Sequence, residues 1–311
     1  MTQITIGVDI SKDTLDVYRL PDGERRQFAN DPAGHKALIA FTGKGVARIV
    51  FEPTGPYHRA FEAALSRKGL PLIKVNPRQA RRFAQAAGKL AKTDQIDAAN
   101  LARMGAALEL EARPPRPEYL NELKELYAAR EALVKDRTAA RNRQKQLTLR
   151  LLKRHNAQRL LQIEHQIEAV EAAITAKLKS DPALARKLEI LTSIPGLSTI
   201  TAFALLIEMP ELGSLEGKQA ASLAGLAPMT RQSGRWTGRA FMSGGRASVR
   251  RALYMPALVA ARFNQDLKAK YEHLVTAGKP PKLAIAAIMR KIIVLANALL
   301  KADRPWAPKP A

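Results

Sequence analysis

The feature that most restricts the fold is a stretch of 63 residues without glycine or proline, from Glu118 to Ser180. Nearly all of these residues favour helix, and the apolar ones recur with amphipathic spacing. Two segments, 122–154 and 158–179, are each long enough for a helix of many turns. We therefore expect two long helices that form a coiled coil, either antiparallel within the chain or between two chains.

This helical stretch carries charge of one sign. Nine basic residues and one acid lie between Lys135 and Arg159. A charge run on a helix is ordinarily a solvated face, but so uniform a run favours a surface that contacts nucleic acid. The whole chain of 311 residues has 51 Lys and Arg against 28 Asp and Glu, a formal net charge of +23. Polyanions are therefore the expected partners.

The first 110 residues alternate between strand and helix signals. Apolar, β-branched runs predict strands, and the segments between them have helical periodicity. The predicted strands lie at 3–10, 14–20, 25–30, 47–52 and 70–76. Three early strands, a helix, and further strands separated by helices are typical of a mixed α/β sheet. The segment 111–118 is rich in Pro and Arg, which predicts a boundary after this sheet.

Residues 181–303 predict a second, mostly helical domain. Within it, residues 191–208 have the pattern of a helix, a Pro-Gly turn and a second helix. That pattern fits a helix-hairpin-helix, whose turn amides and helix N-terminus can hold a phosphate, and it fits an ordinary helix pair equally well. The tail after this domain is expected to fray.

Composition excludes several kinds of site. The chain has no cysteine, so disulfides, thiolate zinc sites and cysteine nucleophiles are excluded, and its five histidines lack metal-ligand spacing. The N-terminus lacks the basic and apolar regions of a signal peptide. The most apolar run near the C-terminus is interrupted by Arg290 and Lys291, so we expect no membrane-spanning segment. A cytoplasmic protein close to nucleic acid is expected.

Four carboxylates could converge on a metal. Asp9 lies near the end of one apolar strand and Glu52 ends another, and an acid there is costly unless it is paired, metal-bound or at an open edge. Asp94 and Asp97 are three residues apart, so a helix would place both on one face. Such a set could hold one or two Mg²⁺ ions for phosphoryl transfer. Each acid also has a simpler explanation: Asp9 could cap a turn, and the pair could stabilise a helix start.

The order of these acids is what a ribonuclease-H-like nuclease core needs, with one on the first strand, one on a later strand and two on a late helix. With the surrounding motifs, the chain resembles the DEDD transposases of bacterial insertion sequences, the insertion-sequence one-ten family, whose relatives include Piv-type DNA invertases. The resemblance extends to about residue 300 and is carried by IGVDISKDTLDV, FEPTGPYH, NPRQARRFAQAAGKLAKTDQIDAANLA, LTSIPGLSTITAFALL, ASLAGLAPMTRQSG and GGRASVRRALYMPALVAAR.

The resemblance implies an architecture and a set of partners. It implies a ribonuclease-H-like (RuvC-like) α/β domain over residues 1–112, coiled-coil helices for oligomerisation and nucleic-acid binding over 113–182, and a helical transposase domain over 183–303, with a tail at 304–311. The implied function is an RNA-guided DNA recombinase that uses Mg²⁺, or Mn²⁺ in its place. Its partners would be donor and target DNA, a guide (bridge) RNA, and further copies of the chain in a homodimer or homotetramer near the bacterial nucleoid.

The family's functional residues map onto this sequence individually. Its four acids map onto Asp9, Glu52, Asp94 and Asp97, and its nucleophilic serine maps onto Ser233. By itself, Ser233 would be a turn residue before a glycine. Because the serine and the acids fall in different domains, we expect the active site to be shared between two protomers. Basic residues expected to contact nucleic acid are Arg231, Arg235, Arg239, Arg246, Arg250, Arg141, Arg143 and Lys145.

Three other functions remain open from the sequence. A RuvC-type junction nuclease would use the same acids with water and form no covalent intermediate. A Piv-type invertase would use the serine chemistry for inversion in place of transposition. A non-catalytic nucleic-acid binder would need only the basic helices and the helix hairpin, and it would leave the four acids without a role.

Overall fold

The protein divides into two compact units, Met1–Arg116 and Pro117–Ala311. The computed structural model describes residues 3–88, 94–112, 117–238 and 240–308. The first unit is a mixed α/β structure and the second is mainly helical, which agrees with the fold classes expected from the sequence.

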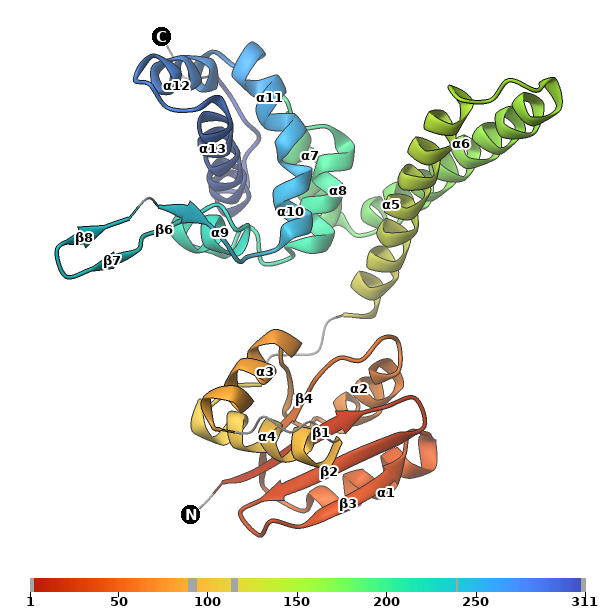
Figure 1. Cartoon of the computed structure of the whole chain (residues 1–311), viewed down its shortest axis with the longest axis vertical. Coiled ribbons are helices and arrows are strands. Elements are labelled where there is room, and N and C mark those ends of the chain that lie inside the picture. Colours follow the sequence, from red (N-terminus) through yellow and green to blue (C-terminus); the bar gives the residue numbers. More distant parts are fainter. Residues whose placement is uncertain (1–2, 89–93, 113–116, 239, 309–311) are drawn as a thin grey trace. The chain divides into compact units, whose positions relative to one another are not determined.

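The first unit is a five-stranded sheet with helices on both faces (Figure 1). The strand order is β3-β2-β1-β4-β5. β1 pairs with β2, and β2 with β3, in antiparallel fashion, whereas β1–β4 and β4–β5 are parallel. This mixed sheet is consistent with the predicted ribonuclease-H-like domain. The elements are β1 (Ile4–Ile10), β2 (Thr14–Leu20), β3 (Arg25–Ala29), α1 (Pro32–Thr42), β4 (Val46–Phe51), α2 (His58–Ser66), β5 (Leu72–Lys74), α3 (Pro77–Ala86) and α4 (Asp94–Ala107).

The two faces of the sheet are covered by different helices because side chains alternate along each strand. One face packs against α1 and α2. Its buried core is formed by Ile6, Val8, Ile10, Leu15, Val17, Leu38, Phe41, Ile49, Phe51, Phe61 and Leu65. On the other face, Tyr18 and Val50 belong to clusters that include residues of α4. The positions of even and odd number along β1 therefore face different layers.

The second unit consists of a long helical pair, a helical bundle and a thin β-ribbon (Figure 1). The elements are α5 (Glu118–Gln144), α6 (Arg150–Lys179), α7 (Pro182–Ser193), α8 (Thr199–Glu208), α9 (Gly217–Leu223), β6 (Pro228–Met229), β7 (Gln232–Ser233), β8 (Trp236–Thr237), β9 (Phe241–Met242), α10 (Ala247–Ala252), α11 (Tyr254–Phe263), α12 (Gln265–Thr276) and α13 (Pro281–Lys301).

The two long helices predicted from the sequence are α5 and α6, and they pack along each other as a hairpin. Their contact buries Ala140, Ile163 and Ile167. Ion pairs join the two helices, among them Arg130 Nε to Glu171 Oε1 at 2.7 Å. Pairing within the chain is thus one of the two arrangements that the sequence allowed. Pairing between chains through a coiled coil stays a prediction.

The helix, Pro-Gly turn and helix predicted at 191–208 are the end of α7, Pro195-Gly196 and α8. Gly196 has a φ of 94°, which favours glycine. A Cβ there would lie 3.3 Å from the carbonyl oxygen of Pro256 and 3.4 Å from Ala260 on α11. The turn therefore packs closely against α11, and its role as a phosphate site stays a prediction.

α13 is a central helix of the bundle. By length and composition it could cross a membrane even though it contains Arg290 and Lys291, so these two residues do not by themselves exclude such a segment. Half of its most apolar window is buried within the second unit, where Ile288, Ile292 and Ala296 are fully buried. This burial is what a core helix of a bundle shows.

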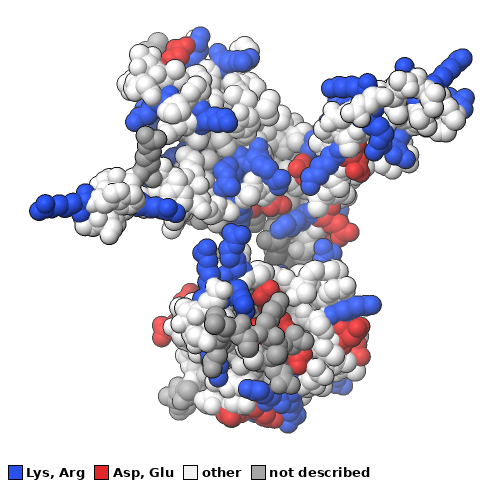
Figure 2. Space-filling model, viewed as in Figure 1, with Lys and Arg blue, Asp and Glu red and all other residues white. Residues whose placement is uncertain are grey.

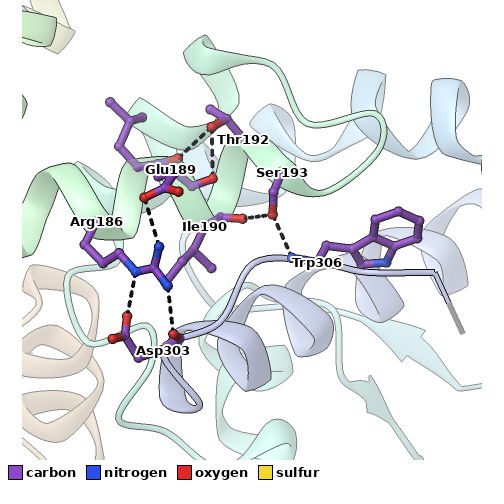
Figure 3. A network of polar contacts seen from close by, with 8 residues as sticks. Arg186, Glu189, Ile190, Thr192, Ser193, Asp303 and Trp306 are labelled. Atoms are coloured by element: carbon purple, nitrogen blue, oxygen red, sulfur yellow. Dashed lines mark hydrogen bonds and ion pairs between the residues drawn. The ribbon is translucent and has the colours of Figure 1, made fainter.

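The start of the C-terminal tail is anchored to α7, contrary to the expected fraying (Figure 3). The backbone N–H of Trp306 donates to Ser193 Oγ at 2.8 Å, and the indole packs against the core of the bundle. Arg186 Nε donates to Asp303 Oδ1 at 3.1 Å just before the tail. The expectation failed because Trp306 is apolar enough to dock on the bundle.

Candidate active site and nucleic-acid interface

Three acidic or amide side chains lie in a row across the first sheet. The register pairs Asp9 on β1 with Asp16 on β2, and Asp16 with Gln27 on β3. On the other side of β1, Val8 pairs with Phe51, the last residue of β4. Glu52 follows Phe51 directly, so it lies at the same end of the sheet as Asp9. Directly paired residues project to the same face, so this row lies at one level of the sheet.

The helix α4 brings its N-terminal turn to the same end of the sheet. A Cβ at Gly7 would lie 2.0 Å from the carbonyl oxygen of Ala98, and a Cβ at Gly105 would lie 2.5 Å from the side chain of Val50 and 3.2 Å from that of Thr5. The helix therefore runs opposite in direction to β1. Its N-terminal turn, which starts at Asp94 and contains Asp97, extends past Gly7 towards the level of Asp9. The side chain of Asp94 lies outside the described residues.

The donor set suits a hard cation in its chemistry. Carboxylate oxygens are the ligands that Mg²⁺ prefers, and Asp9, Glu52 and the N-terminus of α4 lie at one end of the sheet. Asp9, Glu52 and Asp97 each have polar or charged partners. Among the side chains that the structure describes, no three Asp, Glu or His groups are close enough to form a metal site. A complete set would thus need Asp94 or a small rearrangement.

Asp16 is an acidic residue of this row that the sequence reasoning missed. It is 7% exposed, and Gln27 Nε2 donates to its Oδ1 at 3.1 Å and its Oδ2 at 3.3 Å. Asp16 lies directly opposite Asp9, so its carboxylate adds negative potential there. Like charges in this position are destabilising. The sequence does contain a sign of this pairing, because Asp9 and Asp16 are equally distant from the centre of the short turn between β1 and β2, and such residues lie opposite each other in a hairpin.

Two histidines of the first unit lie near this sheet and favour the neutral form. Burial lowers the pKa of His58, and the nearby charge of Lys74 adds to the effect. Burial also lowers the pKa of His35, whose Nε2 is 2.9 Å from Asn30 Oδ1. Neither ring was expected to ligate a metal, and the contact with Asn30 gives His35 a structural role.

Ser233 lies at the tip of a two-stranded ribbon, residues 228–242. The ribbon is formed by β6 with β9 and, further out, β7 with β8 (Figure 1). Gly234 and Arg235 form the two-residue turn, and Gly234 has a φ of 55°, a conformation that favours glycine. Ser233 is exposed, and no described side chain hydrogen-bonds to its hydroxyl. The structure thus presents this hydroxyl to solvent at the end of a projection.

The basic residues predicted to contact nucleic acid divide into exposed and engaged groups. Lys and Arg side chains appear on the ribbon and along the helical pair in Figure 2. Arg231, Arg235, Arg143 and Lys145 are exposed, and so is Arg141, which pairs with Glu164 at 2.8 Å. These five have side chains that an approaching polyanion could reach. Arg239 lies outside the described residues.

Arg246 and Arg250 hold the base of the ribbon. Arg246 Nη1 and Nη2 donate to the two carboxylate oxygens of Glu211, each at 2.7 Å, and Nη1 also donates to the Glu208 carbonyl. The Glu211 carboxylate raises the pKa of Arg246, so it stays charged. Arg250 Nη1 donates to the carbonyl oxygen of Gly244 at 2.9 Å. Both residues order the chain around α10, and nucleic-acid contact by either stays a prediction.

The comparisons with known proteins cover both units. The family model of DEDD transposases of the IS110 type, described as "Transposase", matches residues 6–155. The model described as "Transposase IS116/IS110/IS902 family" matches residues 188–272. The first range contains the four acids and the second contains Ser233. Together they span about three quarters of the chain.

Two curated relatives align along almost the whole chain. The chain is 29% identical over 328 aligned residues to the pilin gene-inverting protein of Moraxella bovis, which covers 98% of this chain and 98% of that protein. The pilin gene-inverting protein of Moraxella lacunata gives the same identity and coverage. Their name states that they invert a pilin gene.

Proposed function

Because the chain belongs to the IS116/IS110/IS902 family of transposases, a family of DNA-recombining enzymes, we propose that it cleaves and rejoins DNA through a covalent bond to Ser233. Asp9, Glu52, Asp94 and Asp97 would hold the divalent cation that such DEDD enzymes generally use. The observation that carries the proposal is that Asp9, Glu52 and the N-terminus of α4 lie at one end of the sheet.

The proposed chemistry is a pair of balanced phosphoryl transfers. Ser233 Oγ loses its proton and forms a bond to the phosphorus of a DNA phosphodiester, while the bond to one ester oxygen breaks and that oxygen takes up a proton. A DNA hydroxyl later attacks the phosphoserine, which frees Ser233 and restores a phosphodiester. Each step makes one ester bond for each that it breaks, so no nucleotide cofactor is needed. A bound Mg²⁺ or Mn²⁺ would polarise the phosphate and stabilise the leaving oxygen.

The side chains around the serine suit phosphate. Arg235 adjoins the serine in the ribbon turn, and Arg231 lies two residues before it. Guanidinium groups hold phosphate oxygens through paired, charge-assisted hydrogen bonds. A serine hydroxyl is a weak nucleophile without a base or metal, and the first unit supplies the acids for a metal. The acids and the serine belong to different compact units, which agrees with the proposal that two protomers share an active site.

The partners proposed follow from the family and from charge. DNA is the substrate class of transposases. We propose in addition a guide RNA, which the exposed cations on α5 and after it support. We also propose a homodimer or homotetramer and a location in the bacterial cytoplasm at the nucleoid. Inversion is a specific second candidate, favoured by the two gene-inverting relatives. It uses the same serine chemistry on two sites of one DNA molecule.

The test is trapping of a protein–DNA adduct. Purified full-length chain is incubated with Mg²⁺ and end-labelled DNA carrying the element ends, with and without RNA transcribed from the flanking DNA, and is then run on a denaturing gel. The parent chain and Gln232→Ala, a control on the opposite face of the ribbon, should form a labelled adduct that protease removes. Ser233→Ala and Asp9→Asn should form none. If the DNA is cleaved without an adduct, and Ser233→Ala cleaves it as well as the parent chain does, the protein is a water-using nuclease and the proposal is overturned.

A further inference from the structure

The ribbon carries a large exposed aromatic residue directly opposite the serine. Trp236 is 59% exposed, and its Cα pairs with that of Ser233 across the two-residue turn. Paired residues on antiparallel strands project to the same face. The indole and the hydroxyl are therefore neighbours on one face of the ribbon tip, and the indole has no role in the chemistry proposed above.

The indole is held flat by a glycine. A Cβ at Gly238 would lie 2.3 Å from Cη2, 2.8 Å from Cζ2 and 3.0 Å from Cζ3 of Trp236. The six-membered ring thus lies across the space that any side chain at position 238 would fill. One side of the ring covers Gly238, while more than half of the surface of Trp236 stays open to solvent. The indole is therefore a preformed stacking surface. Because folding already fixes the ring, a ligand that stacks on it loses less conformational entropy on binding.

The surroundings of the indole select an anionic partner. From Gly217 to Gln265 the chain has no acidic residue. Arg231 stacks on the ring of Phe241, with its Cζ 4.4 Å from the centroid, and Arg235 lies in the turn. Within the described part of the chain neither arginine forms an ion pair. A ligand that presents both phosphates and a flat apolar face would satisfy the cations and the indole together.

We propose that Trp236 stacks on an unpaired base of the DNA strand, next to the phosphate that Ser233 attacks. Aromatic side chains bind single-stranded nucleic acid in this way, and they tolerate any base because every base has a π-face. A fully paired duplex hides its base faces within the helical stack, so it does not offer this contact. The structure thereby assigns the ribbon a preference for DNA that is locally unpaired at the cleavage position. This inference rests on the proposed function only for the identity of the attacked phosphate.

The chain provides its own reporter of this contact. It has two tryptophans, and Trp306 is docked on the bundle (Figure 3). In a Trp306→Phe, Ser233→Ala chain, the fluorescence comes from Trp236 and attack by the Ser233 hydroxyl cannot occur. The probes are a DNA duplex with one unpaired thymine, the same duplex with an abasic residue at that position, and the fully paired duplex. We expect quenching by the first probe and little by the other two.

Affinity measurements on the same probes test the geometry. In the Ser233→Ala background, Trp236→Ala should weaken binding to the unpaired-thymine duplex about tenfold and leave binding to the paired duplex unchanged. Trp236→Phe should retain most of the affinity. Gly238→Ala should weaken it because the new Cβ displaces the indole. Thr237→Ala, on the opposite face of the ribbon, is the matched control, and circular dichroism checks that each variant is folded.

Several results would overturn the inference. Equal quenching by the abasic and unpaired probes would remove the base from the contact. Tighter binding to the same probe made of RNA would exclude DNA as the partner. A change of oligomeric state in Trp236→Ala without DNA would make a second copy of the chain the occupant. An adduct that persists in Ser233→Ala would refute the proposed nucleophile alone, since the stacking assays do not depend on cleavage.

Discussion

Replacing Gly7 by alanine tests whether the close approach of α4 to β1 positions the acids of the first unit. A Cβ at Gly7 would lie 2.0 Å from the Ala98 carbonyl oxygen and 2.5 Å from the Ala102 nitrogen. Both atoms belong to the helix backbone, so no side chain can rotate away. Ordinary van der Waals contact begins near 3.4 Å. The helix must therefore move away from β1 by more than an ångström.

The expected cost follows from this displacement. Overpacking a tight core typically costs about 1–3 kcal/mol, and a clash between backbones belongs at the upper end of that range. For a unit of about a hundred residues, 1 kcal/mol lowers the unfolding midpoint by about 4–8 °C. We expect the midpoint of the first unit to fall by about 10 °C or more. Because Asp97 moves with α4, the stabilisation of this unit by Mg²⁺ should also shrink.

Calorimetry and hydrogen exchange measure the two effects separately. Scanning calorimetry of the full chain gives the midpoints with and without Mg²⁺. Hydrogen exchange read by mass spectrometry should show faster exchange in β1 and α4 of Gly7→Ala, with α7 and α8 unchanged. Gly217→Ala is the matched control, because a Cβ there would meet only the side chain of Val294, at 3.3 Å.

Two outcomes would refute the reasoning at different steps. If Gly7→Ala leaves the unfolding midpoint and the hydrogen exchange of α4 unchanged, the packing of α4 on β1 does not require a residue without a side chain at position 7. If the midpoint falls but Mg²⁺ still raises it as much as in the parent chain, the cation site does not depend on the position of α4. The second result would remove Asp97 from the proposed ligands.

Three further predictions concern other contacts. Gln27→Ala leaves the buried Asp16 carboxylate without its donor, so thermal unfolding should show a loss of about 1–3 kcal/mol in the first unit; an unchanged midpoint contradicts this. Arg246→Ala breaks the paired bonds to Glu211 and should destabilise the second unit by about 1–3 kcal/mol in urea unfolding, whereas lost DNA binding at full stability would make Arg246 a nucleic-acid contact. Burial raises the pKa of Tyr127 to about 12, so between about pH 10 and 12 this side chain ionises only in the unfolded chain. The free energy of unfolding should therefore fall over that range, by at most about 3 kcal/mol. Tyr127→Phe should lack this part of the decline, and a pH profile identical to that of the parent chain would contradict the prediction.

The parts of the fold that were predictable have local signals. The strands of the first unit are apolar, β-branched runs bounded by turns, and α5 and α6 lack glycine and proline over their whole length. Periodicity of this kind reflects burial of a face, so it identifies an element before its partners are known. The acids Asp9 and Glu52 could be proposed for the same reason, since Asp9 lies near the end of an apolar strand and Glu52 directly follows one.

The features that were missed depend on pairing between segments. Asp16 gained its meaning only from the register that sets it opposite Asp9. Arg246 was assigned to nucleic acid from its charge, whereas its partner Glu211 is 35 residues away and was not foreseen. The ribbon has strands of two residues each, which is too short for any alternation to show. A sequence pattern indicates which face of a helix or strand is buried. It does not indicate which other helix or strand packs against that face.

Under the proposed function, the placement of Ser233 and the acids explains how an exposed hydroxyl could attack DNA without cleaving it at random. Ser233 sits on a narrow ribbon tip, where an attacking group can reach a phosphate on a bulky nucleic acid without a clash with the bundle. A lone serine hydroxyl is a poor nucleophile, so exposure alone does no harm. The acids that would activate its target lie in the other compact unit, on a sheet end fixed by the packing of α4 on Gly7. Under the proposed function, cleavage then requires that DNA, the ribbon and an acidic sheet end be assembled together, and a stacking contact at Trp236 would make an unpaired strand part of that requirement.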